Sequence, residues 1–360
     1  MSTEHIILNQ DARDLMDVPS KSIDLIVTSP PYPMIEMWDE MFFSQNSDIK
    51  GSFKKGDFEL CFELMHKELD KVWLECSRVL KEGGFACINI GDATRTLSNN
   101  FRLFSNHSRI ISGCLHIGFQ NLPNIIWRKQ TNAPNKFMGS GMLPAGAYVT
   151  LEHEFILIFR KGCKREFNNK NDKEKRHNSA YFWEERNSWF SDLWDLKGTN
   201  QLIRNDASRK RSAAFPYAIP HRLINMYSVE GDTVLDPFTG TGTTSMAAIG
   251  SKRNSIGVEI DTSLINVITT TLLNSETYVN NFNQRRIENH LEFVKRRIEL
   301  KGEEGLKYTN EHYQFPVMTK QEKRLSIPFV REITSIDNKI LVRYKENVDI
   351  LNFERGSLFD

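Results

Sequence analysis

The chain has 360 residues, 39% of them hydrophobic, which is enough to build one large domain and a smaller addition. Its formal net charge of +1 at pH 7 excludes an overall basic balance, so any nucleic-acid binding must come from local patches. Its five cysteines form no Cys-x-x-Cys pair, and no secretory signal or apolar run of membrane length is present, so we expect a cytoplasmic protein without a zinc site or a membrane partner.

Two short strands open the expected fold. Residues 6–8 are apolar and run into a polar turn that contains Asp11, and residues 22–28 form a second, largely apolar strand. Between them, residues 12–22 are expected to form a short helix and a turn. Ligands bind at the carboxyl ends of strands in open parallel sheets, so the residues that follow the second strand are candidates for a binding site.

The second strand breaks abruptly into Ser29, Pro30, Pro31 and Tyr32. Proline lacks a backbone N–H and fixes φ, so the carbonyls of Ser29 and Pro30 are free to accept hydrogens from a ligand. The Ser29 hydroxyl can also accept, and the Tyr32 ring offers a flat face. These groups suit a planar molecule with an exocyclic amine. For an isolated match of this length, a Pro-Pro turn after a strand is the simpler alternative.

The next stretch, residues 33–56, has no clear hydrophobic period, so we expect a long loop that acts as a lid or binding loop, with disorder as the alternative. Residues 58–81 carry apolar positions at helical spacing and end at a glycine pair, and residues 85–90 predict a strand. Residues 107–119 predict a helix.

Two further strands are expected at residues 124–129 and 152–160, around a segment at 130–150 rich in Asn, Pro and Gly. The composition then changes. Residues 161–211 contain 13 Lys and Arg against 8 Asp and Glu, with aromatic residues between them. Basic side chains neutralise phosphates while aromatic and amide groups contact bases. A solvated face over a small aromatic core is the alternative.

A second motif occupies residues 231–261, which predict a strand, a Gly-rich turn, a helix of small residues, another strand and a terminal acid. This layout binds adenosine-containing cofactors: Gly240 and Gly242 allow close approach of the backbone, and Glu259 is placed to accept from ribose hydroxyls. Thr243 follows Gly242 where a phosphate-binding loop would need lysine. A nicotinamide cofactor shares the turn and the acid, although the third glycine is missing.

The two motifs in this order resemble the DNA amino-methyltransferases that use S-adenosylmethionine to modify N4 of cytosine or N6 of adenine. The resemblance is to the permuted (β) group, in which the catalytic motif precedes the cofactor motif, and it covers roughly residues 5–270. It implies an α/β, Rossmann-like methyltransferase fold with a mixed seven-stranded sheet, circularly permuted, an antiparallel strand near one edge, and a small target-recognition insert.

The resemblance also assigns roles to residues. The catalytic residues it implies are Ser29, Pro30, Pro31 and Tyr32. The cofactor contacts it implies are Asp11, Phe215, Asp236, Phe238, Gly240, Gly242, Thr243 and Glu259. Asp11 matches a position that approaches the cofactor adenine, with an ordinary turn aspartate as the alternative. Residues 212–226 resemble the helix beneath the methionine end of the cofactor, but Ser212 and Ala213 stand where the family often has His-Pro. No metal is implied.

Four regions follow. Residues 1–160 are the catalytic half of the methyltransferase domain, 161–211 the target-recognition region, 212–274 the cofactor-binding half, and 275–360 a C-terminal helical and hairpin extension to which the resemblance gives no role. In the extension, an apolar stripe at residues 284–300 predicts a helix packed on the catalytic domain or on a second copy of the chain in a homodimer. Residues 332–344 predict a hairpin around Asp337 and Asn338.

The implied function is site-specific methyl transfer to N4 of cytosine in double-stranded DNA, after the base flips out of the duplex. Serine at the first motif position is commoner among the cytosine-N4 members of the family, and aspartate among the adenine-N6 members. N6-adenine methylation is therefore one alternative, and a catalytically silent DNA-recognition subunit is another. Methylation at carbon 5 of cytosine needs a cysteine after proline, and none of the five cysteines follows one. A cognate restriction endonuclease is an expected partner.

Overall fold

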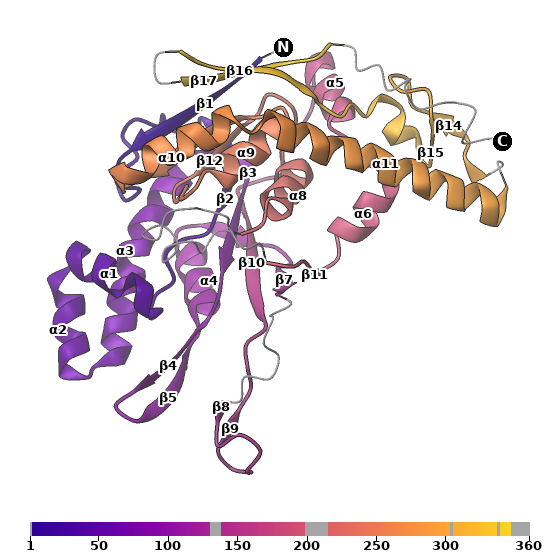
Figure 1. Cartoon of the computed structure of the whole chain (residues 1–360). Coiled ribbons are helices and arrows are strands. Elements are labelled where there is room, and N and C mark those ends of the chain that lie inside the picture. The colour runs from indigo at the N-terminus through magenta and orange to yellow at the C-terminus, as the bar shows by residue number, and fades with distance from the viewer. Residues whose placement is uncertain (1, 130–137, 199–214, 303–304, 337–338, 347–360) are drawn as a thin grey trace.

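The computed structural model of the chain describes residues 2–129, 138–198, 215–302, 305–336 and 339–346. The strands of its large central sheet are β1 (Ser2–Asn9), β2 (Ile23–Thr28), β3 (Leu80–Ile90), β6 (Phe119–Asn121), β7 (Ile125–Arg128), β10 (His153–Lys161), β11 (Leu193–Asp195), β12 (Thr233–Asp236), β13 (Asn254–Glu259), β16 (Val330–Ile336) and β17 (Lys339–Tyr344). Their order is β11-β7-β10-β3-β2-β12-β13-β1-β17-β16, with β6 beside β10 (Figure 1).

This sheet has the Rossmann-like arrangement that the sequence predicted. Neighbouring strands are parallel from β3 through β2, β12 and β13 to β1, and β10 is antiparallel between β3 and β7. Among the described residues, the sheet has 11 strands. The additional ones are β6 and β11 at one side and the β16–β17 pair at the other, and without these four the expected mixed set of seven remains.

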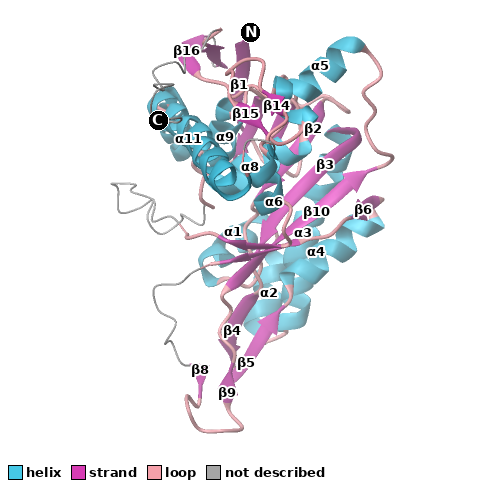
Figure 2. Cartoon of the chain, turned by 90° about the vertical axis from the view of Figure 1, so that its right-hand side faces the viewer, coloured by secondary structure: helices cyan, strands magenta, loops and turns pink. Residues whose placement is uncertain are grey.

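Helices cover both faces of the sheet (Figure 2). The helices of the described residues are η1 (Glu36–Trp38), α1 (Asp39–Gln45), α2 (Ser47–Lys55), α3 (Phe58–Val79), α4 (Asn106–His116), α5 (Lys170–Asn178), α6 (Trp183–Trp189), α8 (Ala218–Tyr227), α9 (Thr243–Gly250), α10 (Thr262–Leu273), α11 (Glu276–Lys301) and η3 (Lys320–Arg324). Residues of α3 and α4 form one core with β2, β3 and β10, and residues of α8, α9 and α10 form the other. Alternate residues of β2 serve the two cores: Ile26 faces the first and Leu25 the second.

The prediction of a long loop at residues 33–56 is wrong, because this stretch folds into η1, α1 and α2. Phe42 and Ile49 are fully buried in the core beneath α3, which supplies the stability that such short helices lack alone. The Asn46 side chain accepts from the Asp48 N–H at the start of α2, and Gly56 ends it in the left-handed conformation. Helices this short show too few turns for a period to be recognised.

The helix expected within residues 12–22 is also absent, and that stretch forms turns. The longer elements are confirmed: the helix predicted at 58–81 is α3, and the hairpin predicted at 332–344 is β16–β17. The stripe predicted at 284–300 lies on α11, where Ile287 and Leu291 are buried within this chain. Among the described residues, no helix has both the length and the apolar character needed to span a bilayer.

Small hairpins complete the fold. They are formed by β4 (Ala93–Leu97) with β5 (Asn100–Phe104), β8 (Met138–Gly139) with β9 (Ala147–Tyr148), and β14 (Tyr308–Thr309) with β15 (Pro316–Val317). Of the segments for which the sequence predicted a loop or a recognition role, residues 130–137 and 199–211 lie outside the described residues.

Candidate active site

The two motifs, far apart in the sequence, lie side by side in the sheet. β2 and β12 are parallel neighbours in which Val234 pairs with Leu25, so their carboxyl ends lie side by side. We call the line formed by these carboxyl ends of the strands the catalytic edge of the sheet. At that edge the Thr28 hydroxyl donates to the Asp236 carboxylate at 2.7 Å. Ser29 is the next residue after Thr28, so the segment expected to bind the target amine starts beside the segment expected to bind the cofactor.

Asp236 joins this strand end to the Gly-rich turn. One carboxylate oxygen accepts from the Phe238 N–H at 3.0 Å, and the other accepts from the Thr244 hydroxyl of α9 at 2.6 Å. Burial raises the pKa of Asp236, and the hydrogen bonds from Thr244 and Thr28 oppose that rise by favouring the charged form. The carboxylate therefore holds the turn between β12 and α9 in one shape.

Both glycines of the turn have the left-handed backbone, with φ of +56° at Gly240 and +85° at Gly242. A Cβ at Gly242 would meet Ile268 Cγ2 at 3.0 Å, so this glycine allows the turn to pack against α10. A Cβ at Gly240 would meet nothing closer than the Phe238 carbonyl at 3.9 Å. Gly240 therefore borders open space, as close approach by a ligand requires. Thr243 follows as the first residue of α9.

Glu259 ends β13, next to the turn. Its carboxylate accepts from the N–H of Gly240 at 3.0 Å and from the N–H of Asp261 at 2.8 Å. Burial raises its pKa, and those two backbone hydrogen bonds oppose the rise. A carboxylate has about four acceptor sites, so lone pairs remain for ribose hydroxyls.

Asp11 lies just beyond β1, whose last residue, Asn9, pairs with Glu259. Its carboxylate is already engaged: it accepts from the Arg13 N–H at 2.9 Å and from Arg13 Nη2 at 2.7 Å. Burial raises the pKa of Asp11, but the hydrogen bonds and charge of Arg13 outweigh this effect and hold it below its ordinary value. Any contact with a cofactor adenine would share Asp11 with this arginine.

The ends of β2, β12, β13 and β1 thus stand in one row. Neighbouring strands are about 4.8 Å apart, so the row is about 14 Å long, which suits an extended nucleoside derivative. The two predicted aromatic contacts are mostly packed in the protein. Phe215 is 6% exposed in the core cluster that also contains Val27, and the Phe238 ring lies edge-on to Trp73 with 6.3 Å between centroids.

A hydrogen-bonded network holds the Ser29 end of the row. The hydroxyls of Ser29 and Tyr32 lie 3.1 Å apart, and Tyr32 donates to Glu154 at 3.0 Å. Asn89 Nδ2 donates to the Tyr32 hydroxyl at 2.8 Å and to Glu154 at 2.7 Å, and Lys129 forms an ion pair with the same carboxylate. Burial and the nearby Glu154 raise the pKa of Tyr32 well above its ordinary value. Tyr32 therefore stays a neutral hydrogen-bond donor.

The position of Tyr32 limits how much of its ring a ligand can contact. Its side chain is only 8% exposed, and a Cβ at Gly91 would lie 3.0 Å from its ring. The ring is thus packed against the end of β3, so most of its surface is covered by the protein. The flat face expected to stack on a ligand is therefore largely covered, whereas the Tyr32 hydroxyl lies 3.1 Å from that of Ser29.

Sequence reasoning missed Asn89, Lys129 and Glu154. Each lies at the same sheet edge, on or beside the neighbouring strands β3, β7 and β10. The available signal was an amide at position 89 inside the otherwise apolar end of a strand. Asn89 Oδ1 is buried and has no hydrogen-bond partner among the described residues, so an acceptor remains unused in the site. Across the described residues, no group of three or more His, Cys, Asp or Glu is arranged to hold a metal ion.

Comparisons with known proteins agree with this geometry. A DNA methylase family, the N6 and N4 methyltransferases, matches residues 23–270. The type II methyltransferase M.MthZI of Methanothermobacter thermautotrophicus is 47% identical over 340 residues, covering 94% of each chain. M.MjaI of Methanocaldococcus jannaschii is 51% identical over 279 residues, covering 74% of this chain and 91% of the relative. The protein TTHA0409 of Thermus thermophilus, solved with S-adenosyl-L-methionine, superposes with a TM-score of 0.59 at 29% identity over 75% of this chain and 94% of the other.

Proposed function

Because this chain belongs to the family of N6 and N4 DNA methylases and is thus an S-adenosylmethionine-dependent DNA methyltransferase, we propose that it methylates N4 of cytosine. The observation that carries this choice is Ser29, a neutral hydroxyl at the first position of the catalytic motif. That hydroxyl sits within hydrogen-bonding distance of Tyr32 in a network fixed by Glu154.

The exocyclic amine of cytosine is a poor nucleophile because its lone pair is delocalised into the ring. In our proposal, the Ser29 hydroxyl and the Pro30 carbonyl accept the amine hydrogens, which draws the nitrogen toward tetrahedral geometry and localises the lone pair. Pro30 and Pro31 contribute by lacking N–H groups that would otherwise compete for those acceptors. The network behind Ser29 fixes the acceptors before the base arrives, so little reorganisation remains for the reaction itself.

S-adenosylmethionine supplies the electrophilic methyl group when bound. We propose that Asp11 and Glu259 face its adenosine, Glu259 through the ribose hydroxyls, while Gly240, Gly242 and Thr243 border its path. Asp236, Phe238 and Phe215 would shape the site from beneath rather than contact the ligand over a large area. The open space at Gly240 and the spare lone pairs of Glu259 support this assignment.

The amine is paired inside a duplex, so the cytosine must flip into the site at a cost of a few kcal/mol. We propose that the halves at residues 1–160 and 212–274 act together at this one edge of the sheet. A restriction endonuclease of the same specificity is the partner we propose, because the relatives M.MthZI and M.MjaI carry type II names.

Nucleoside analysis tests the choice of atom. The full chain is incubated with S-adenosylmethionine and unmethylated duplex DNA, and the digested product is separated by mass spectrometry. We expect N4-methylcytosine in the wild type and at least about a hundredfold less in Ser29→Ala, because the amine loses one of its two acceptors. Product that contains only N6-methyladenine would refute the cytosine proposal, and equal incorporation by Ser29→Ala would remove Ser29 from the mechanism.

A further inference from the structure

Two hairpins project from the edge of the sheet that carries Ser29 (Figures 1 and 2). The first is β4–β5, which starts at Ala93 just after β3 ends at Ile90. The second is β8–β9, which precedes β10. Because β3 is parallel to β2 and β10 is antiparallel to β3, both hairpins leave the sheet at the end where β2 runs into Ser29. We call residues 93–104 the first arm and residues 138–149 the second arm.

The first arm has a defined turn and a fixed position. The first turns at Ser98 and Asn99, both with positive φ, and Leu97 pairs with Asn100 across this two-residue turn, as in the tight turns that match the twist of a hairpin. A two-pronged ion pair between Arg95 and Asp39, at 3.0 and 2.7 Å, fixes the first arm to α1.

The arms also contact each other. The rings of Phe101 and Tyr148 stack with centroids 4.3 Å apart and planes inclined by 18°. This contact places the second arm beside the first, so the two together form one surface that extends beyond the catalytic edge.

The sequence of this region has an unusual charge pattern. Residues 93–151 contain no Asp or Glu, although the chain as a whole has 46 of them in 360 residues. The same stretch carries six Lys and Arg. Two of them, Arg95 and Arg102, lie on the first arm, and Arg102 pairs with the exposed Glu59 in an exchangeable surface ion pair that leaves it free to turn toward a phosphate. Arms that contribute no carboxylate of their own do not repel a polyanion.

The second arm exposes large apolar side chains. Met142, Leu143 and Val149 are 88%, 69% and 85% exposed, which is rare for such residues when they have no partner. On DNA, apolar side chains contact thymine methyl groups or wedge between base steps. Such a wedge suits an enzyme that must leave a gap in the base stack.

We propose that the two arms are the target-recognition surface, with Met142 and Leu143 entering a groove of the duplex next to the flipped base. This inference rests on the proposed DNA methyl transfer. It moves recognition away from α5 and α6, which lie within the residues 161–211 where the sequence pattern had placed it.

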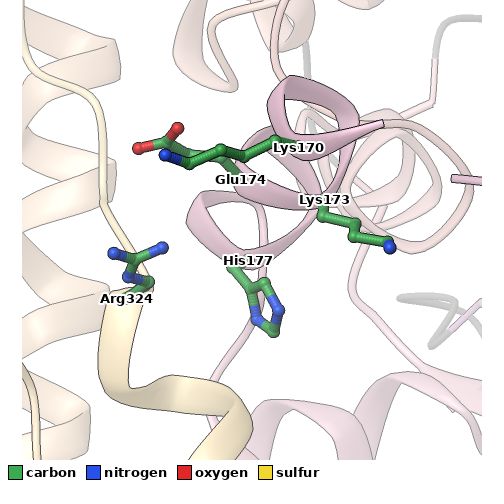
Figure 3. A pocket seen from close by; sticks show the side chains of 5 residues that line it. All are labelled: Lys170, Lys173, Glu174, His177 and Arg324. Atoms are coloured by element: carbon green, nitrogen blue, oxygen red, sulfur yellow. The ribbon is translucent and has the colours of Figure 1, made fainter. Parts of the chain in front are cut away.

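The positions of α5 and α6 support this choice, whereas β11 returns to the catalytic edge, where Asp195 pairs with Arg128 of β7. The segment that leads into α5 lies at the opposite end of the strands from the catalytic edge. There Arg165 pairs at 2.6 Å with Asp232, the residue just before β12. α6 then packs on α11 through the Glu185–Arg286 ion pair at 2.6 Å. A cavity of about 520 Å³ lies between α5 and η3, lined by Lys170, Lys173, Glu174, His177 and Arg324 (Figure 3). It is basic but faces away from the catalytic edge, so it supplies a matched control.

The test compares two double variants of the full chain. Met142→Ser with Leu143→Ser alters the second arm, and Lys170→Ala with Lys173→Ala alters α5. All four side chains are on the surface, so both variants should fold. The affinity for fluorescently labelled, unmethylated genomic DNA fragments is measured by anisotropy, alongside KM for DNA, kcat and the affinity for S-adenosylmethionine.

We expect the arm variant to weaken DNA binding and raise KM for DNA about tenfold or more, with unchanged cofactor affinity. The α5 variant should stay within about twofold of wild type. Wild-type DNA affinity in the arm variant, or a larger loss in the α5 variant, would overturn the inference. So would a change in oligomeric state without a change in DNA affinity, which would make the arm a contact between copies. A wild type that binds DNA through the arms but does not methylate it would instead refute the proposed function.

Discussion

Glu154 determines how the proposed target-binding serine is held. Its side chain is 12% exposed and receives hydrogen bonds from Tyr32 and Asn89 as well as the ion pair with Lys129. A mostly buried carboxylate is stable only with such partners. The network therefore couples the neighbouring strands β3, β7 and β10 to the position of Ser29.

Glu154→Gln tests this coupling. Glutamine has one acceptor oxygen and no charge, so it cannot accept from both Tyr32 and Asn89 while pairing with Lys129. We expect kcat for DNA methylation to fall about tenfold and the free energy of unfolding to fall by about 1–2 kcal/mol. The affinity for S-adenosylmethionine should not change.

Glu152→Gln is the matched control for that substitution. Glu152 lies two positions earlier, is 40% exposed and meets Arg128 only at 3.9 Å. Its removal should leave kcat within about twofold of wild type, since exposed pairs contribute about 0–1 kcal/mol. If the two variants lose activity equally, the network behind Ser29 does not position it.

The turn between β12 and α9 is the element on which cofactor binding is expected to depend. Gly240→Ala forces a side chain onto a left-handed backbone, at about 1 kcal/mol, and puts a methyl group into the open space beside the turn. We expect the dissociation constant for S-adenosylmethionine, measured by calorimetry, to rise about tenfold or more.

Gly56→Ala provides the comparison, because Gly56 has φ of +77° at the end of α2 and a Cβ at this position would have no atom within 4 Å. It carries the same backbone strain at a place far from the turn in the sequence. We expect a similar loss of stability and an unchanged cofactor affinity. Equal cofactor affinity in both variants would show that the space at Gly240 is not used.

At the scale of the whole molecule, the first and last strands of the described residues are fastened together. β17 pairs with β1, and the Tyr344 hydroxyl contacts the Thr3 hydroxyl at 2.9 Å and donates to the Ile249 carbonyl at 2.9 Å. His5 joins the same cluster through Thr3 and Ser255. The C-terminal extension, for which the sequence offered no role, thus pairs with β1 through β17, so β1 is not left as an unpaired outer strand of the sheet.

Buried histidines make the stability of the molecule depend on pH. Burial lowers the pKa of His5 to about 3, and burial together with Arg109 lowers the pKa of His66 to about 3, from an ordinary value of 6.5. Between these values the unfolded chain binds protons that the folded chain does not. The contribution of these two histidines to the free energy of unfolding is therefore fully present above about pH 6.5, and it is lost as the pH falls toward 3.

We expect urea unfolding to show this loss between about pH 7.5 and pH 5. The double variant His5→Gln with His66→Gln should lose less stability over that range, by about 1 kcal/mol per pH unit for each histidine removed. The carboxylates are the same in both proteins, so their contribution cancels in the comparison. An identical pH slope in wild type and variant would contradict the assignment.

The sequence alone determined the long elements and the chemistry of the two motifs. α3 was predictable because its apolar period is sustained over 22 residues, and the turn at Gly240 because few other residues accept its backbone. The short helices α1 and α2 were missed because their stability comes from burying Phe42 and Ile49 under α3, which no local pattern contains.

Only the tertiary structure decided how these pieces meet. Strand order set β2 beside β12 and so brought Thr28 to Asp236, a contact between residues 208 positions apart. It also placed Glu154 behind Ser29 and both arms at the catalytic edge, while sending α5 to the other side. The physical reason is that residue type fixes what a side chain can donate, accept or bury, whereas its partners depend on the pairing of distant strands.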